Sequence, residues 1–182
     1  MTGTPRGSVD RTSGHAPDLG FAPTDLEALP RIEGAPPRGL FALAHIVLAS
    51  ETSALVPHAN NVVILSWVDT VASLHGAAAG APRDALARTG RMWFVARHEI
   101  DYLGEAFAGD RLLLVTWVEK LGRTSLVRAT RILRDDGTLL TSARSRWALV
   151  DLASRRPTAI PDAVRAALMD GSVLSDKAPT GH

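Results

Sequence analysis

One long helix-forming segment, followed mainly by strand-forming segments, limits the folds open to this chain of 182 residues. Between residues 60 and 75, the side chains of Ile64, Val68, Val71 and His75 recur at the spacing of one helical stripe. Most neighbouring positions are apolar as well, so we expect a heavily buried helix. A lone helix of this kind must bury its surface against another layer of structure, normally a sheet.

Several segments have the length and composition of strands, and short Gly- or Asp-rich breaks separate the last four. The break at residues 135–137 reads DDG, which is a typical hairpin signal. A short helix is predicted over residues 160–169. The fold class is therefore predicted to be α+β, with one helix on a curved antiparallel sheet in two layers. The predicted strands cover residues 40–49, 93–102, 111–121, 125–134 and 139–150.

The two ends of the chain differ in composition from its centre. Residues 1–38 are rich in Pro, Gly, Ser and Thr, and we expect a mostly irregular arm with one short helix over residues 24–29. Residues 171–182 are polar and are expected to be a frayed tail. The folded domain is therefore predicted to span residues 39–170.

Composition excludes several classes of function. The chain has 20 basic and 19 acidic side chains, so its net charge of +1 gives no electrostatic reason to bind nucleic acid or an anionic membrane. It contains no Cys, which excludes disulfides, Cys-ligated zinc and a Cys nucleophile. No apolar run reaches the roughly 18 residues that span a bilayer, and the N-terminus lacks the apolar core of a signal peptide. We therefore expect a cytoplasmic protein.

Two sequence stretches carry a resemblance to a known family. Residues 58–69 read HANNVVILSWVD and residues 99–110 read EIDYLGEAFAGD. Over about residues 40–168, these motifs resemble the hotdog-fold acyl thioesterases, in the branch of 4-hydroxybenzoyl-CoA thioesterase and acyl-ACP thioesterase. The match is strengthened by shorter pieces that follow in order at residues 121–125, 135–137, 150–151 and 155–161.

The resemblance implies a fold, a partner and a substrate class. The fold is a hotdog, a curved antiparallel sheet wrapped around one long central helix. The partner is a second copy of the chain, because the apolar run 112–118 indicates extra burial, and two such homodimers can stack into a homotetramer. The implied substrate is an acyl-CoA or acyl carrier protein thioester, with no cofactor. His45, His75 and His98 lack the spacing of metal ligands, so no metal is expected.

The catalytic carboxylate of the family is missing from its usual place. Relatives carry an Asp a few residues before the His of this motif, and Ala54 occupies that position here. Two other carboxylates remain open: Glu51, at the end of the first strand, and Asp69, about two turns into the helix. His58, just before the helix, is a candidate base or water-orienting group, and a structural histidine is the alternative.

Thioester hydrolysis also needs hydrogen-bond donors for the developing oxyanion. Backbone N–H groups near Asn60 and Asn61, at the positive end of the helix dipole, can supply them, although Asn is also a preferred N-cap. The resemblance further implies that Tyr102 contributes to the substrate site. It also implies that Arg123 and Thr124, in a tight turn between two strands, contact the CoA phosphates.

Three functions therefore stand open at this point. The first is hydrolysis of an acyl thioester to free acid and thiol. The second is an acyl-thioester-binding hotdog protein that does not hydrolyse its ligand, as a sensor or accessory subunit, which the vacant position at Ala54 favours. The third is a dehydratase on the same fold, which would need an Asp/His motif that this sequence lacks.

Overall fold

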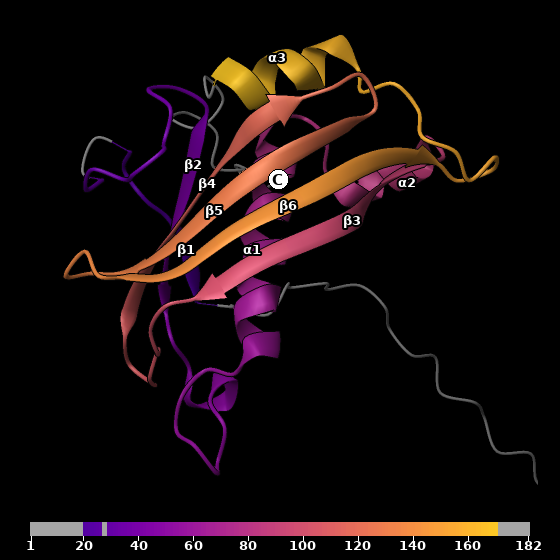
Figure 1. The fold of residues 1–182 in the computed structure, drawn as a ribbon. Helices are drawn as coiled ribbons and strands as arrows, with labels where there is room; N and C mark the ends of the chain where they lie inside the picture. Colours follow the sequence, from indigo (N-terminus) through magenta and orange to yellow (C-terminus); the bar gives the residue numbers. More distant parts are fainter. Residues whose placement is uncertain (1–19, 27–28, 171–182) are drawn as a thin grey trace, which may run out of the picture.

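The structure is a computed structural model that describes residues 20–26 and 29–170. Figure 1 shows a sheet crossed on one side by a long helix, so the predicted α+β class is confirmed. The elements are β1 (Phe21–Pro23), β2 (Leu40–Ile46), the 3₁₀ helix η1 (Ala49–Glu51), α1 (Asn61–Ala78), α2 (Arg83–Arg88), β3 (Arg91–Tyr102), β4 (Arg111–Leu121), β5 (Ser125–Arg134), β6 (Leu139–Asp151) and α3 (Asp162–Asp170).

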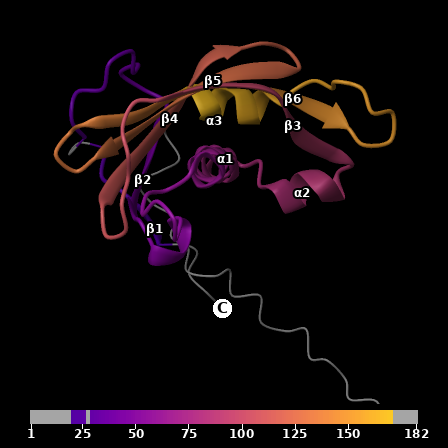
Figure 2. The same cartoon turned by 60° about the horizontal axis from the view of Figure 1, so that its bottom comes forward.

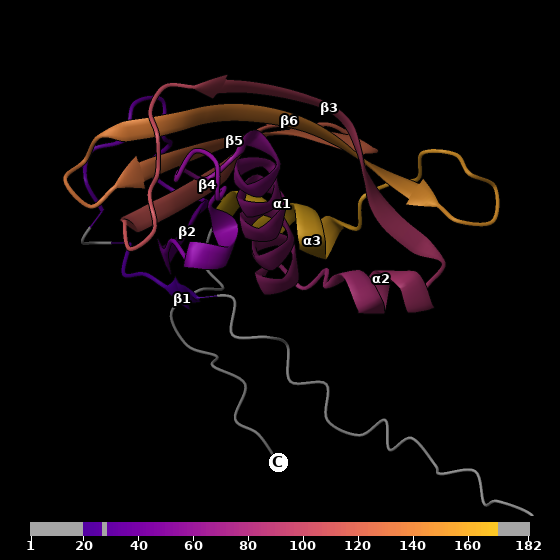
Figure 3. The same cartoon turned by 90° about the horizontal axis from the view of Figure 1, so that it is seen from below.

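The six strands form one antiparallel sheet in the order β1-β2-β4-β5-β6-β3. The sheet curves around α1, which lies in its concave face, with α2 and α3 on the same side (Figure 2). The view from below shows α1 running beneath the middle strands (Figure 3). This is the hotdog arrangement that the sequence motifs implied.

The predicted helical stripe faces the sheet. Ile64, Val68 and Val71 are buried, and they pack with Leu114 of β4 and Ile132 of β5 in one apolar cluster. A second cluster lies beneath α3, where Val164 and Leu168 pack with Leu149. Burial of this apolar surface stabilises α1 more than its β-branched residues would by intrinsic propensity.

The part of the convex face formed by β2, β4 and β5 is covered by the chain itself, which corrects one expectation. The apolar run 112–118 was assigned to a partner subunit, but its outward-facing side chains, including Val115 and Trp117, pack against Ile32, Ala35 and neighbouring apolar residues that precede β2. The alternating pattern of β4 explains the whole run, because one face meets α1 and the other meets this N-terminal segment.

The described part of residues 1–38 is mostly irregular, as predicted, but it contains one short strand that was not predicted. Residues 21–23 form β1, which pairs with β2, and Thr24–Leu26 are not helical, so the short helix expected from residue 24 is wrong there. The helix α2 was missed, and the first long strand ends at Ile46 before η1 begins. Short elements of three to six residues give too few repeats for periodicity to reveal them. None of the described helices is long and apolar enough to cross a membrane.

Candidate functional site at the start of α1

A pocket of about 280 Å³ opens at the N-terminal end of α1. Two segments that are distant in sequence form it: the entry to α1 and the turn that follows β3. The backbone holds them together, since Ala59 N–H donates to the carbonyl of Ala106 at 2.8 Å and His58 bridges to Phe107. The lining residues are His58, Ala59, Asn61, Ile64, Tyr102, Leu103, Gly104 and Glu105. Of the predicted site residues, His58, Asn61 and Tyr102 therefore meet in one place.

A histidine and a carboxylate face each other in this pocket. Nδ1 of His58 lies 3.3 Å from Oε1 of Glu105, although the contact lacks the alignment of a hydrogen bond. The His58 side chain is 30% exposed and that of Glu105 is 60% exposed, so both can reach a ligand. Such contacts in unliganded sites are often long and tighten when substrate binds.

The sequence analysis missed Glu105, although it lies within the quoted stretch 99–110. The strand β3 ends at Tyr102, and the chain then turns back towards the entry of α1. This reversal brings a residue 47 positions downstream to His58, a contact that local spacing does not reveal. The signal available was a carboxylate three residues after Tyr102, inside a motif already recognised.

One backbone N–H group in the first turn of α1 has no acceptor among the described residues. The side-chain oxygen of Asn60 accepts hydrogen bonds from the N–H groups of Val62 and Val63, at 2.9 and 3.0 Å. Asn60 is therefore the N-cap, as one of the two alternatives predicted. Ile64 N–H bonds to the carbonyl of Asn60. Within the described part of the chain, the N–H of Asn61 has no acceptor, and it lies at the positive end of the helix dipole.

Glu51 is engaged elsewhere. Its carboxylate accepts hydrogen bonds from the Trp67 indole at 2.8 Å, from the Leu48 N–H at 2.8 Å and from His45 Nε2 at 2.9 Å. His45 itself is buried and stacks on Phe21. This network ties η1 to β2 and α1, and Glu51 does not line the pocket of His58.

Asp69 and the turn at residues 123–124 also lie outside this pocket. Asp69 forms an ion pair with Arg83 at 3.0 Å, with both side chains partly exposed. Arg123 and Thr124 follow β4, whereas the His58 pocket lies near its beginning. At about 3.3 Å per residue, the two ends of this strand are about 33 Å apart. Arg123 lines a separate shallow pocket beside α3.

Comparison with known proteins places these residues in a family context. Residues 57–141 match the family model described as the Thioesterase superfamily. This region contains α1, the turn after β3 and both residues of the His58–Glu105 contact.

The chain is also similar to a plant protein. It is 30% identical over 109 residues to the chloroplastic palmitoyl-acyl carrier protein thioesterase of Cuphea hookeriana. The aligned region covers 56% of this chain and 26% of the plant protein. The chain thus spans about a quarter of the length of the curated relatives that it matches.

Solved structures share the architecture. A 1,4-dihydroxy-2-naphthoyl-CoA thioesterase from Synechocystis superposes with a TM-score of 0.66 at 16% identity, over 71% of this chain and 95% of that one. An acyl-ACP thioesterase from Bacteroides thetaiotaomicron superposes with a TM-score of 0.63 at 19% identity, over 79% of this chain and 57% of that one. At these identities, the likeness establishes the fold.

Proposed function

Residues 57–141 belong to the thioesterase superfamily within a hotdog fold, and from this premise we propose that the protein hydrolyses an acyl thioester to free acid and thiol. The observation that carries the proposal is the contact of His58 with Glu105 beside the unpaired N–H of Asn61. A base and an oxyanion donor are the two groups that thioester hydrolysis most needs.

In the proposed mechanism, His58 accepts a proton from a water molecule that attacks the thioester carbonyl carbon. The carboxylate of Glu105, 3.3 Å away, stabilises the imidazolium that forms. The N–H of Asn61 donates to the developing oxyanion. When the tetrahedral intermediate collapses, the sulfur leaves as a thiolate, which needs little assistance because thiol pKa values are about 8.5.

The proposed substrate is the thioester of CoA or of an acyl carrier protein. Similarity to known proteins supports this class, since the relatives include thioesterases for both carriers. The rim of the pocket supports an apolar acyl group, because Tyr102 and Leu103 are 43% and 59% exposed. Arg123 and Thr124 lie too far from the His58 pocket of their own subunit to share its substrate. We therefore propose that they contact the CoA phosphates of a substrate bound in the His58 pocket of a second subunit.

A homodimer is proposed as the active form. The strand β3 lies at one edge of the sheet and pairs only with β6 among the described strands. Phe94 and Val95 on this edge strand are 43% and 37% exposed, and an edge strand with exposed apolar side chains is a template for pairing with another chain. A second β3, paired edge to edge, would extend both sheets. Light scattering at micromolar concentration tests this proposal, and a monomer would contradict it.

Release of free thiol from a panel of acyl-CoAs and acyl carrier proteins tests the proposed activity. Wild type should release thiol from at least one carrier, and His58→Ala should release it about 10²–10⁴ times more slowly. The binding-only alternative predicts instead that an intact acyl-CoA raises the melting temperature while no thiol appears. Absence of both turnover and binding would remove the support for a thioester ligand.

A further inference from the structure

A positive charge is buried beneath the second half of α1. Arg128, on β5, is only 4% exposed, and its guanidinium faces the helix instead of solvent. Burial lowers the pKa of Arg128 to about 10, so the side chain remains protonated at neutral pH. Charged side chains buried in proteins are normally paired with an opposite charge, because removing them from water is costly.

The described residues leave this charge without a counter-ion. Nη1 of Arg128 donates to Nδ1 of His75 at 2.6 Å and makes a longer contact of 3.4 Å with the Thr116 hydroxyl. Burial, together with the charge of Arg128, holds the pKa of His75 well below 6.5, so His75 is a neutral acceptor. Nε and Nη2 of Arg128 have no hydrogen-bond partner in the described part of the chain.

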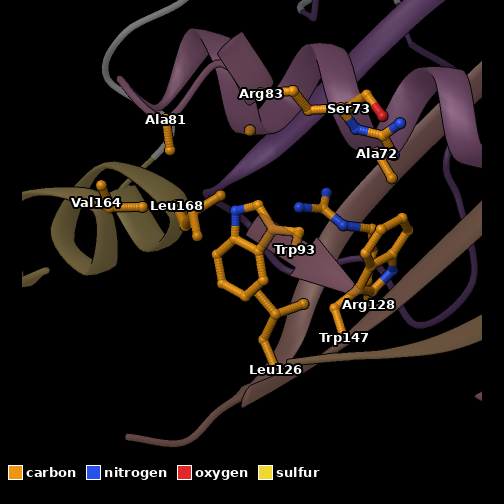
Figure 4. A pocket seen from close by; sticks show the side chains of 11 residues that line it. Ala72, Ser73, Ala81, Arg83, Trp93, Leu126, Arg128, Trp147, Val164 and Leu168 are labelled. Atoms are coloured by element: carbon orange, nitrogen blue, oxygen red, sulfur yellow. The ribbon is translucent and has the colours of Figure 1, made fainter. Parts of the chain in front are cut away.

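The guanidinium points into a pocket bounded by α1, the sheet and α3 (Figure 4). The rings of Trp93 and Trp147 form its apolar walls, and Ser73 and Arg83 lie on the side of α1 and α2. The indole Nε1 of Trp147 is also buried, and the residues that the structure describes offer it no hydrogen-bond partner. The described residues that line this pocket therefore include several donors and no carboxylate.

The one acidic side chain of α1 is already engaged. Asp69, one helical turn before Ser73, is paired with Arg83 and does not line the pocket. The pocket holds about 410 Å³ of unfilled space including its open mouth, and its closed part has room for about one water-sized group. Its closed part therefore suits one small polar group instead of a long chain.

We propose that this pocket binds a small monoanion, either the carboxylate of an organic acid or a halide ion, through the free Nε and Nη2 donors of Arg128. The planar guanidinium presents these donors as a fork that matches a carboxylate. The site shares no lining residue with the pocket of His58. From Ile64 to Ala72 the axis of α1 advances about 12 Å, so this is a second site beyond the proposed hydrolysis.

Thermal unfolding with three probes tests the proposal: sodium butyrate, sodium chloride and butyramide, the neutral analogue of butyrate. A ligand at ten times its dissociation constant shifts the unfolding equilibrium about elevenfold, which raises the melting temperature of a chain of this size by about 3–6 °C. We expect this shift with butyrate or chloride, but not with butyramide. A response to butyrate alone identifies a carboxylate site, and an equal response to chloride identifies a general anion site.

Two variants assign the shift to Arg128. Arg128→Met removes the charge and should abolish the specific shift, leaving only the general effect of salt. Arg131→Met is the matched control, because Arg131 lies on the same strand but packs over Trp117 on the opposite face, and it should keep the shift. An equal shift with butyramide, no shift with either anion, or a full shift in Arg128→Met would overturn the proposal.

Tryptophan fluorescence emission tests anion binding in the Arg128 pocket if Arg128→Met does not fold. Because Trp93 and Trp147 line the pocket, binding of butyrate or chloride to wild type should change the emission saturably, while butyramide should not. Arg128→Lys keeps the charge but loses the fork, so it should bind butyrate at least several-fold more weakly. Emission that ignores both anions, or that responds equally to butyramide, would contradict an anion site.

Discussion

Nδ1 of His58 lies 3.3 Å from the Glu105 carboxylate, which joins the entry of α1 to the turn after β3. The pair lies in the pocket that also contains Asn61 and Tyr102. A carboxylate thus reaches the proposed site from a segment other than those that hold Glu51 and Asp69. Substitution of each carboxylate in turn distinguishes Glu105 from Glu51 and Asp69, the two that the sequence favours.

Glu105→Gln should lower kcat/KM for thioester hydrolysis by about 10²–10⁴, because an amide cannot stabilise the His58 imidazolium. The melting temperature should change little, since the Glu105 side chain is 60% exposed. Thiol release by the purified variant checks the first expectation, and calorimetry checks the second. Glu33→Gln, an exposed substitution in the segment before β2, is the control and should retain full activity. Unchanged activity in Glu105→Gln would remove Glu105 from the mechanism.

Glu51→Ala should lower the stability of the protein. Its carboxylate accepts three hydrogen bonds, and its loss leaves the Trp67 indole and His45 without their acceptor. We expect the free energy of unfolding to fall by about 2–4 kcal/mol, measured by urea denaturation with an unchanged slope. The folded variant should still hydrolyse its substrate. A fully stable but inactive Glu51→Ala protein would instead identify Glu51 as the catalytic carboxylate.

Asp69→Asn should change neither thioesterase activity nor stability by much. The ion pair with Arg83 joins two side chains that are 39% and 46% exposed, and pairs of this kind contribute about 0–1 kcal/mol. Thiol release and thermal unfolding of the variant should therefore match those of wild type closely. A large loss of activity with normal stability would favour the helix carboxylate over Glu105.

The sequence was sufficient to predict the long elements. The helix around Val68 and the four strands from β3 to β6 have enough residues for a clear period, and each is found within a few positions of its prediction. The turn at residues 135–137 likewise joins β5 to β6 as predicted. Fold class follows from such elements, because their order leaves few ways to bury one helix against one sheet.

The site was less predictable because its residues meet only in three dimensions. His58, Asn61 and Tyr102 belong to recognisable motifs, whereas Glu105 and Arg128 matter through their long-range neighbours. Arg128 in particular is a charged residue type that is mostly exposed in proteins, so the sequence gives no sign of its burial. Only the register of the sheet places its side chain under α1, next to His75.

His75 should make stability depend on pH. Because its pKa in the folded protein is well below 6.5, the unfolded chain binds more protons at acidic pH, and stability is lost as the pH falls below about 6.5. His75→Gln keeps an acceptor for Arg128 but does not titrate.

Between pH 7.5 and 5.5, the free energy of unfolding should fall by about 1.4 kcal/mol less in His75→Gln than in wild type. Urea denaturation at each pH measures this difference. Burial also lowers the pKa of His98, which lies on β3, but His98 is present in both proteins and its effect cancels. Identical pH dependence in the two proteins would mean that His75 is protonated in the folded state. Its nitrogen could then not accept the hydrogen bond from Arg128.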